Sequence, residues 1–213
     1  MSEISRRGIL DVNARSLCDL LGVDYSLVTY HFGSFDGLLA EVFVKAHDIW
    51  IDCIRQALSQ EYSDPEERFR AVIKAQVQRA VTYGSVIGLA HLPHVSENVE
   101  RILAEKFPER LADAVAYGVA VSAVLIRDFR TGNMSPFTLE ISDLPVALLE
   151  GELKDIMPTA ARLQWALVGP TLWMTGAAGG QGDITSKEKM VQSSTLLDAY
   201  IDKLVISAKI EDL

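Results

Sequence analysis

Apolar residues recur at three- and four-residue steps along most of this chain, which is the spacing typical of amphipathic helices. The longest such stripe starts at Ser34 and reaches about Ala57. Further helices are predicted at about 64–83, 96–107, 108–129, 143–156, 159–177 and 186–208. A short helix that ends at about residue 91 is predicted between the first two of these. No stretch has the strict alternation of a strand. The pattern therefore predicts an all-α fold.

Helix boundaries are marked by capping residues. The run Asp64-Pro65-Glu66-Glu67 combines a cap, a proline at the first helical position and acids in the first turn. Ser96 caps a later helix, and Pro108 interrupts it before a longer one begins. Residues 114–126, AVAYGVAVSAVLI, are apolar almost all round. We therefore expect this segment to form the buried centre of the molecule.

Two short helices joined by a tight turn are predicted at residues 13–32, NARSLCDLLGVDYSLVTYHF. Asn13 and Asp24 are suited to cap them, and Gly22 stands where the first must stop, a position that often needs positive φ. The apolar residues expected to face inward are Leu17, Cys18, Leu20, Leu21, Val23, Leu27 and Val28. Tyr25, Ser26, Thr29 and Tyr30 are expected outside. This is the geometry of a helix-turn-helix, which enters a DNA major groove.

The sequence GVDYSLVTYHF followed by GSFDGLL resembles the DNA-binding segment of the tetracycline-repressor-like (TetR) transcriptional regulators. The resemblance in motif covers this segment; the remaining chain agrees in length and helical layout only. It implies a helix-turn-helix DNA-binding domain at 1–50 and a larger helical ligand-binding and dimerisation domain at 51–213. The implied function is a ligand-responsive regulator, commonly a repressor, that binds a palindromic double-stranded DNA operator as a homodimer.

The resemblance also implies which residues touch DNA. Arg15 would contact a base or a phosphate, and Tyr25, Ser26 and Thr29 would reach base edges or thymine methyls. The residues placed near backbone phosphates are Tyr30, His31 and, at the start of the next helix, Ser34. An internal hinge is the alternative role for His31.

In the body, the resemblance implies an inducer cavity and a dimer interface made by the last two helices. The candidate cavity residues are Trp50, Phe69, Tyr83, His91, Tyr117, Trp165 and Trp173. Few interior charges are evident, so a small, fairly apolar inducer is expected. The candidate interface residues are Leu163, Leu167, Met174, Met190, Leu197, Ile201 and Leu204. Their spacing fits a helix–helix seam, but an intrachain core would show the same stripe.

One feature counts against DNA binding, and two others depart from the family pattern. The net charge is −9, and residues 1–50 carry four Arg and Lys against seven carboxylates, which opposes phosphate binding. Phe35 stands where the family usually places a lysine. The family's first helix precedes a glycine that aligns with Gly8, and Gly8 lies too near Met1 to leave room for a full helix. Either the true start lies upstream, which we favour, or the first helix is truncated. The alternative function is a dimer of this fold that has lost DNA binding and binds a ligand or protein instead.

Enzyme and metal functions have little support. Pro93 prevents His91 and His94 from sharing a helix face, and no nucleophile elbow or phosphate-binding glycine loop is present. Cys18 and Cys53 lack metal or redox spacing and are expected to be reduced thiols in a cytoplasmic protein. The apolar run at 163–180 contains Gln164, Pro170 and several glycines, so it is a poor membrane span. We expect no catalytic activity, no cofactor, no metal and no membrane partner.

Overall fold

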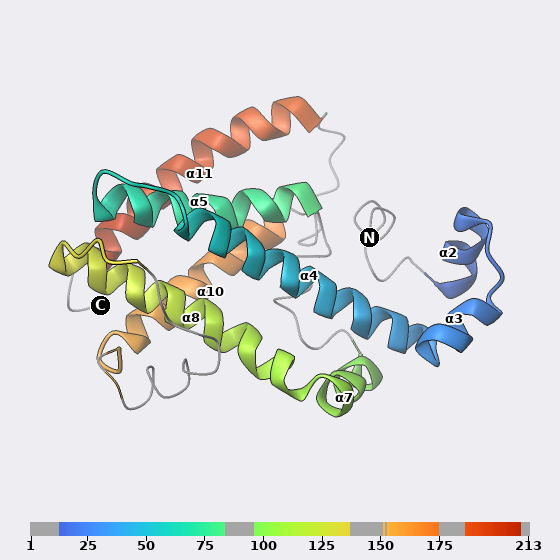
Figure 1. Ribbon diagram of the computed structural model, residues 1–213. Helices are drawn as coiled ribbons and strands as arrows, with labels where there is room; N and C mark the ends of the chain where they lie inside the picture. Colours follow the sequence, from blue (N-terminus) through green and yellow to red (C-terminus); the bar gives the residue numbers. More distant parts are fainter. Residues whose placement is uncertain (1–12, 84–95, 137–150, 152, 175–185, 210–213) are drawn as a thin grey trace.

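The computed structural model describes residues 13–83, 96–136, 151, 153–174 and 186–209, and their regular structure is entirely helical (Figure 1). In chain order the helices are α2 (Ala14–Leu21), α3 (Ser26–Phe32), α4 (Phe35–Leu58), α5 (Pro65–Tyr83), α7 (Glu97–Lys106), α8 (Pro108–Thr131), α10 (Met157–Met174) and α11 (Ser186–Lys209). The predicted all-α class is confirmed for this part of the chain.

The helices form a small head and a larger body joined by α4. Helices α2 and α3 lie at one end of the molecule, and α4 runs from them into the body without a break (Figure 1). There it packs against α5, α7 and α8. Because α4 spans residues 35–58, it crosses the predicted boundary at residue 50, and the head and the body share this rod.

Capping side chains begin the helices where the sequence predicted them. Asn13 and Ser16 form a reciprocal capping box, in which Asn13 Oδ1 accepts from the Ser16 backbone N–H at 2.9 Å. Asp64 Oδ1 accepts from the Glu67 N–H at 2.9 Å, and Ser96 caps α7 in the same way. Helices α4, α5, α7 and α8 start within two residues of the predicted positions.

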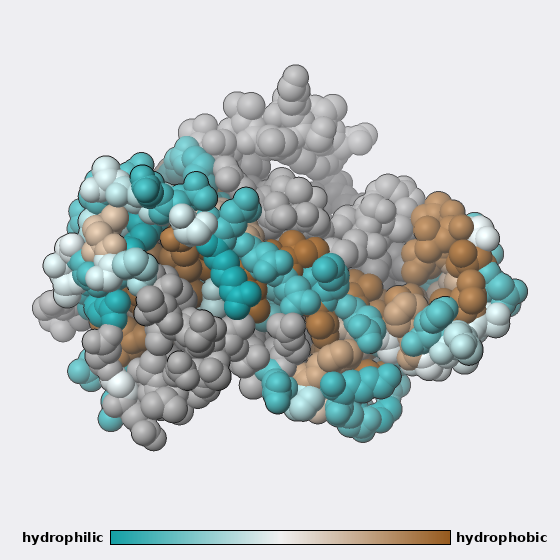
Figure 2. Space-filling view, in the orientation of Figure 1, coloured by the Kyte–Doolittle hydropathy of each residue, from teal (hydrophilic) through white to brown (hydrophobic). Residues whose placement is uncertain are grey.

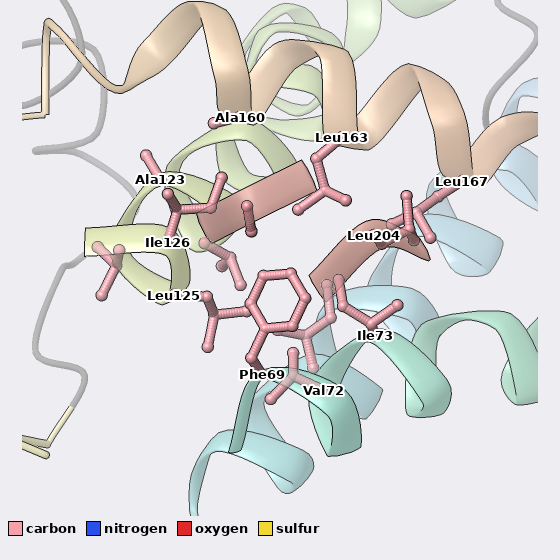
Figure 3. Packing of buried hydrophobic residues seen from close by; sticks show 14 of the residues in the cluster. Phe69, Val72, Ile73, Ala123, Leu125, Ile126, Ala160, Leu163, Leu167 and Leu204 are labelled. Carbon is pink, nitrogen blue, oxygen red and sulfur yellow. The ribbon is translucent and has the colours of Figure 1, made fainter. Parts of the chain in front are cut away.

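The body core is formed where α4, α5, α8, α10 and α11 meet, and Figure 3 shows part of it. Phe69 of α5 is fully buried and stacks on Phe129 of α8, with ring centroids 5.7 Å apart. Residues 117–126 of α8 are buried except for the half-buried Val119. This confirms the predicted buried centre over the described side chains of that segment.

A second, smaller core attaches the head-side half of α4 to α7. Leu39, Ala40 and Phe43 are buried there against Val99 and Leu103. The head-side half of α4 is thus fixed to the body by apolar packing. Because α3 packs directly against the start of α4, any shift of α4 would carry the head with it.

A buried polar network lies where α5 meets the end of α8. The Arg68 guanidinium pairs with Asp128 and donates to the Asn133 carbonyl at 3.1 Å and the Ser135 carbonyl at 3.0 Å. Arg127 donates to the other oxygen of Asp128 at 2.9 Å. These hydrogen bonds hold the turn after α8 against α5. Sequence reasoning missed it because the partners lie 60 residues apart.

The predicted dimer seam needs correction. Five of its residues are buried in the core of their own chain, so these side chains cannot offer a surface to a second copy: Leu163, Leu167, Leu197, Ile201 and Leu204. The intrachain alternative applies to them, because both kinds of packing produce the same stripe. The side chains of Met174 and Met190 lie outside the described part, as do the predicted helix that ends near residue 91 and most of the one predicted at 143–156.

Candidate nucleic-acid interface

A left-handed glycine makes the turn between α2 and α3. Gly22 has φ +66°, a conformation that disfavours other residues, and Val23 N–H donates to the Cys18 carbonyl at 3.0 Å. Asp24 lies in the turn before α3, where its Oδ1 accepts from the Ser26 N–H at 2.7 Å. Hydrogen bonds from the Ser26 side chain and backbone hold the pKa of Asp24 below its usual value. An ionised carboxylate therefore lies at the positive end of α3.

The outer face of α3 is open to solvent. Val28 is buried and Phe32 is half-buried, which orients α3 against the rest of the head. Tyr30 is 82% exposed and Tyr25 is 51% exposed. The other predicted contact residues, Arg15, Ser26, Thr29, His31 and Ser34, are exposed as well. The structure thus brings six of the seven together around α3, with Arg15 at the start of α2.

The junction between α3 and α4 depends on a glycine that sequence reasoning did not single out. Gly37 is buried in the first turn of α4, and a Cβ at this position would collide with the carbonyl oxygen of Phe32 in α3. The absence of a side chain lets the start of α4 lie directly against the end of α3. A glycine so early in a strongly patterned helix was the available signal.

Ser34 and His31 are partly engaged within the protein. Ser34 Oγ accepts from the Gly37 N–H at 3.0 Å and caps α4, which leaves the hydroxyl hydrogen available to donate to a phosphate. The His31 ring lies edge-on to Tyr30, with centroids 4.9 Å apart. His31 remains exposed, so its ring is available on the surface beside Tyr30.

Four apolar residues of the head do not face inward as predicted. Leu20, Leu21, Val23 and Leu27 are 57%, 63%, 40% and 44% exposed, and apolar atoms cover part of the head surface (Figure 2). The physical reason is that such short helices bury at most about one residue per turn: α2 buries Ala14 and Cys18, and α3 buries Val28. Val28 occupies the inward position of α3, so Leu27, about 100° away around the axis, lies outside.

Acidic side chains outnumber basic ones in the head. From Ser16 to Val44 the chain contains no Arg, Lys, Asn or Gln, whereas it contains Asp19, Asp24, Asp36 and Glu41. Arg15 at the start of α2 is therefore the cation nearest to α3 in sequence. A DNA contact made by this head would rely on few phosphate-neutralising groups.

The candidate ligand residues are divided between core and surface. Trp50 and Tyr117 are buried and meet edge-to-face at 6.2 Å, and a Cβ on Gly118 would lie 2.8 Å from the Trp50 ring. Phe69 belongs to the packed core described above. Trp165 differs from its predicted interior position, because it is 80% exposed on the side of α10 away from Leu163. The side chains of Tyr83 and Trp173, and all of His91, lie outside the described part.

The described part of the chain offers neither a metal site nor a membrane span. Among the side chains that the structure describes, no group of three His, Cys, Asp or Glu is arranged to hold a metal ion. None of the described helices has the length and apolarity needed to cross a bilayer. An open surface depression is lined by Glu66, Phe129, Arg130 and Lys209, in a different part of the body from Trp50 and Tyr117.

Comparisons with known proteins agree with this architecture. No family model and no curated protein matches the sequence. The solved structure of the TetR family transcriptional regulator PfmR from Thermus thermophilus is similar, with a TM-score of 0.53 over 96% of this chain and 93% of that chain, at 16% identity. At such identity the likeness concerns the fold. The chain therefore has the fold of a TetR family transcriptional regulator, with a helix-turn-helix head on a helical body.

Proposed function

We propose that this protein is a DNA-binding transcriptional regulator, acting as a homodimeric repressor that a small, fairly apolar ligand releases from its operator. The observation that carries the proposal is the outer face of α3, which is exposed at the far end of the rigid rod α4 (Figure 1). A short exposed helix braced by a preceding one is the form in which proteins read a major groove. The shared fold supports the same function.

The proposed dimer uses the outer faces of the last two helices. Trp165 on α10 and Ile206 on α11 are 80% and 53% exposed in the single chain, which is unusual for large apolar side chains. Burying them against a second copy would remove this apolar surface from water. A two-fold dimer can place two α3 helices about 34 Å apart, one helical turn of DNA.

The proposed ligand response acts through α4. Trp50 lies on α4 and contacts Tyr117 of α8 in the body, while the same helix begins beside α3 in the head. A ligand that favours a different position of α4 against α8 would change the spacing of the two heads. DNA release then follows from the ligand's preference for that conformation.

The test is a selection for bound DNA followed by titration. Random duplexes are selected with the purified protein, and binding to the recovered sequence is measured by fluorescence anisotropy at two salt concentrations. The proposal expects a palindromic sequence, salt-sensitive affinity and about tenfold weaker binding by Tyr30→Ala, which corresponds to about 1.4 kcal/mol and lies within the range for losing one base contact. Recovery of no sequence at low salt would contradict it.

That negative result would favour the second candidate function, a dimer that binds a ligand or protein without DNA. The observation in its favour is the acidic head, which lacks any Arg or Lys between Ser16 and Val44. The ligand response is tested separately: an inducer identified by thermal-shift screening must weaken operator affinity at saturation. Unchanged affinity would remove the ligand-responsive part of the proposal.

A further inference from the structure

The outer face of α3 lacks the side chains that make the most discriminating contacts to bases. Guanine is read mainly by Arg or Lys, and adenine by the two-pronged amide of Asn or Gln. Neither α3 nor the adjoining residues from Ser16 to Val44 contain any of these four residue types. Ser26 and Thr29 offer hydroxyls, which donate or accept at either kind of base pair and discriminate weakly. Sequence discrimination by this face must therefore have another source.

Leu27 supplies an apolar group at that face. It is 44% exposed and lies one helical turn from Tyr30, which is 82% exposed, so the two side chains are neighbours on the helix surface. Thr29 is also exposed and adds a methyl group. The face consequently presents carbon atoms between its hydroxyl groups.

Asp24 does not supply a further polar contact to bases. Its carboxylate is engaged in the turn before α3, where it accepts from the Ser26 N–H at 2.7 Å. Its negative charge beside the start of α3 also repels a phosphate there. The groups that α3 itself offers to the groove are therefore apolar side chains, hydroxyl groups and the exposed His31 ring.

We infer that Leu27 is a specificity-determining residue that reads thymine C5-methyl groups in the major groove. The methyl group is the one apolar feature that a base pair presents there, and it distinguishes thymine from the other three bases. This inference rests on the proposed function, and it names the sequence class that the regulator would select: half-sites in which thymines lie under the outer face of α3.

Uracil-substituted operators test the inference directly, because deoxyuridine differs from thymidine only by the missing methyl. Each thymine of the selected duplex is replaced in turn, and affinities are measured for the wild-type protein and for Leu27→Ala. We expect about three- to fivefold weaker wild-type binding at one or more positions per half-site, as for losing one buried methyl-sized group. In Leu27→Ala, replacing thymine by uracil at one of these positions no longer lowers the affinity, while the effects at the other positions persist.

Leu20→Ala is the matched control, since Leu20 is a leucine of similar exposure on α2. It must keep the wild-type response to uracil, and both variants must keep the wild-type unfolding temperature. Sequence-specific binding that ignores every thymine-to-uracil change, or a response unchanged in Leu27→Ala, overturns the inference and leaves the proposed function standing. Absence of any sequence-specific binding overturns the proposed function, and the inference with it.

Discussion

Individual charged residues show how this fold places polar groups in its interior. Arg68 and Asp128 have side chains only 7% and 2% exposed, and each is held by further hydrogen bonds, from Arg127 to Asp128 and from Arg68 to two backbone carbonyls. The Nε of Arg68 is buried without a hydrogen-bond partner. Such a pair adds little net stability compared with apolar packing, but removal of one partner leaves an uncompensated buried charge.

Asp128→Asn is therefore expected to lower the free energy of unfolding by about 3–5 kcal/mol, because Arg68 and Arg127 lose their common carboxylate. Urea denaturation of the purified variant measures this. Arg101→Ala is the control, since its pair with Glu105 is an exposed pair within one helix, worth about 0.3–0.5 kcal/mol. Equal decreases in the free energy of unfolding for the two variants would show that burial of the ion pair does not determine how much its loss destabilises the protein.

Glu66 links protonation to stability. Hydrogen bonds from Arg70 at 2.9 Å and Lys209 at 3.1 Å hold the pKa of Glu66 below its ordinary value of 4.5. A carboxyl with a lowered folded-state pKa stabilises the protein above its unfolded-state pKa, and the contribution is lost as the pH falls through the folded-state value. Glu66→Gln should thus be less stable than wild type at neutral pH, with the difference shrinking as the pH falls below 4.5. A difference independent of pH would contradict this.

At the scale of the helices, the sequence predicted what depends on local signals. The caps Asn13, Asp64 and Ser96 are used as expected, because each satisfies backbone N–H groups of its own helix. The apolar residues that recur at three- and four-residue steps along α4 also predicted which face of this long helix points inward. The short helices α2 and α3 were harder, since seven or eight residues do not define a stripe, and Leu20 and Leu27 proved to be exposed.

Gly37 tests the α3–α4 junction. In an ordinary helix interior, alanine would be more stable than glycine by about 1 kcal/mol. Here the added methyl meets the Phe32 carbonyl oxygen, so we expect Gly37→Ala to destabilise the protein by about 1–3 kcal/mol instead. Thermal unfolding gives the sign of the change. A raised unfolding temperature would show that α3 and α4 are not packed as closely as described.

At the scale of the whole molecule, pattern alone could not separate packing within a chain from packing between chains. Leu163 and Ile201 lie on faces with the seam spacing, yet they are buried within their own chain. The Arg68–Asp128 pair was equally invisible, because nothing local connects the two residues. The exposed side chains of Trp165 on α10 and Ile206 on α11 indicate where a second chain could pack, and the sequence pattern did not predict their exposure.

Trp165→Asp is expected to convert a dimer into a monomer at micromolar concentration, because a carboxylate would be buried at the proposed interface without a partner. Sedimentation velocity measures the change in mass. Tyr30→Asp is the matched control, since it alters an aromatic residue of similar exposure in the head and should leave the dimer intact. A wild-type protein that sediments as a monomer would contradict the two-fold arrangement.

In the proposed complex, the outer face of α3 meets DNA while the outer face of α10 meets a second copy. A photo-crosslinking amino acid, benzoylphenylalanine, placed at position 30 or at position 165 tests both surfaces in one experiment, because Tyr30 and Trp165 are 82% and 80% exposed. With the selected duplex present, irradiation should join position 30 to DNA and position 165 to another protein chain. Crosslinks to DNA from position 165, or none to DNA from position 30, would contradict the account.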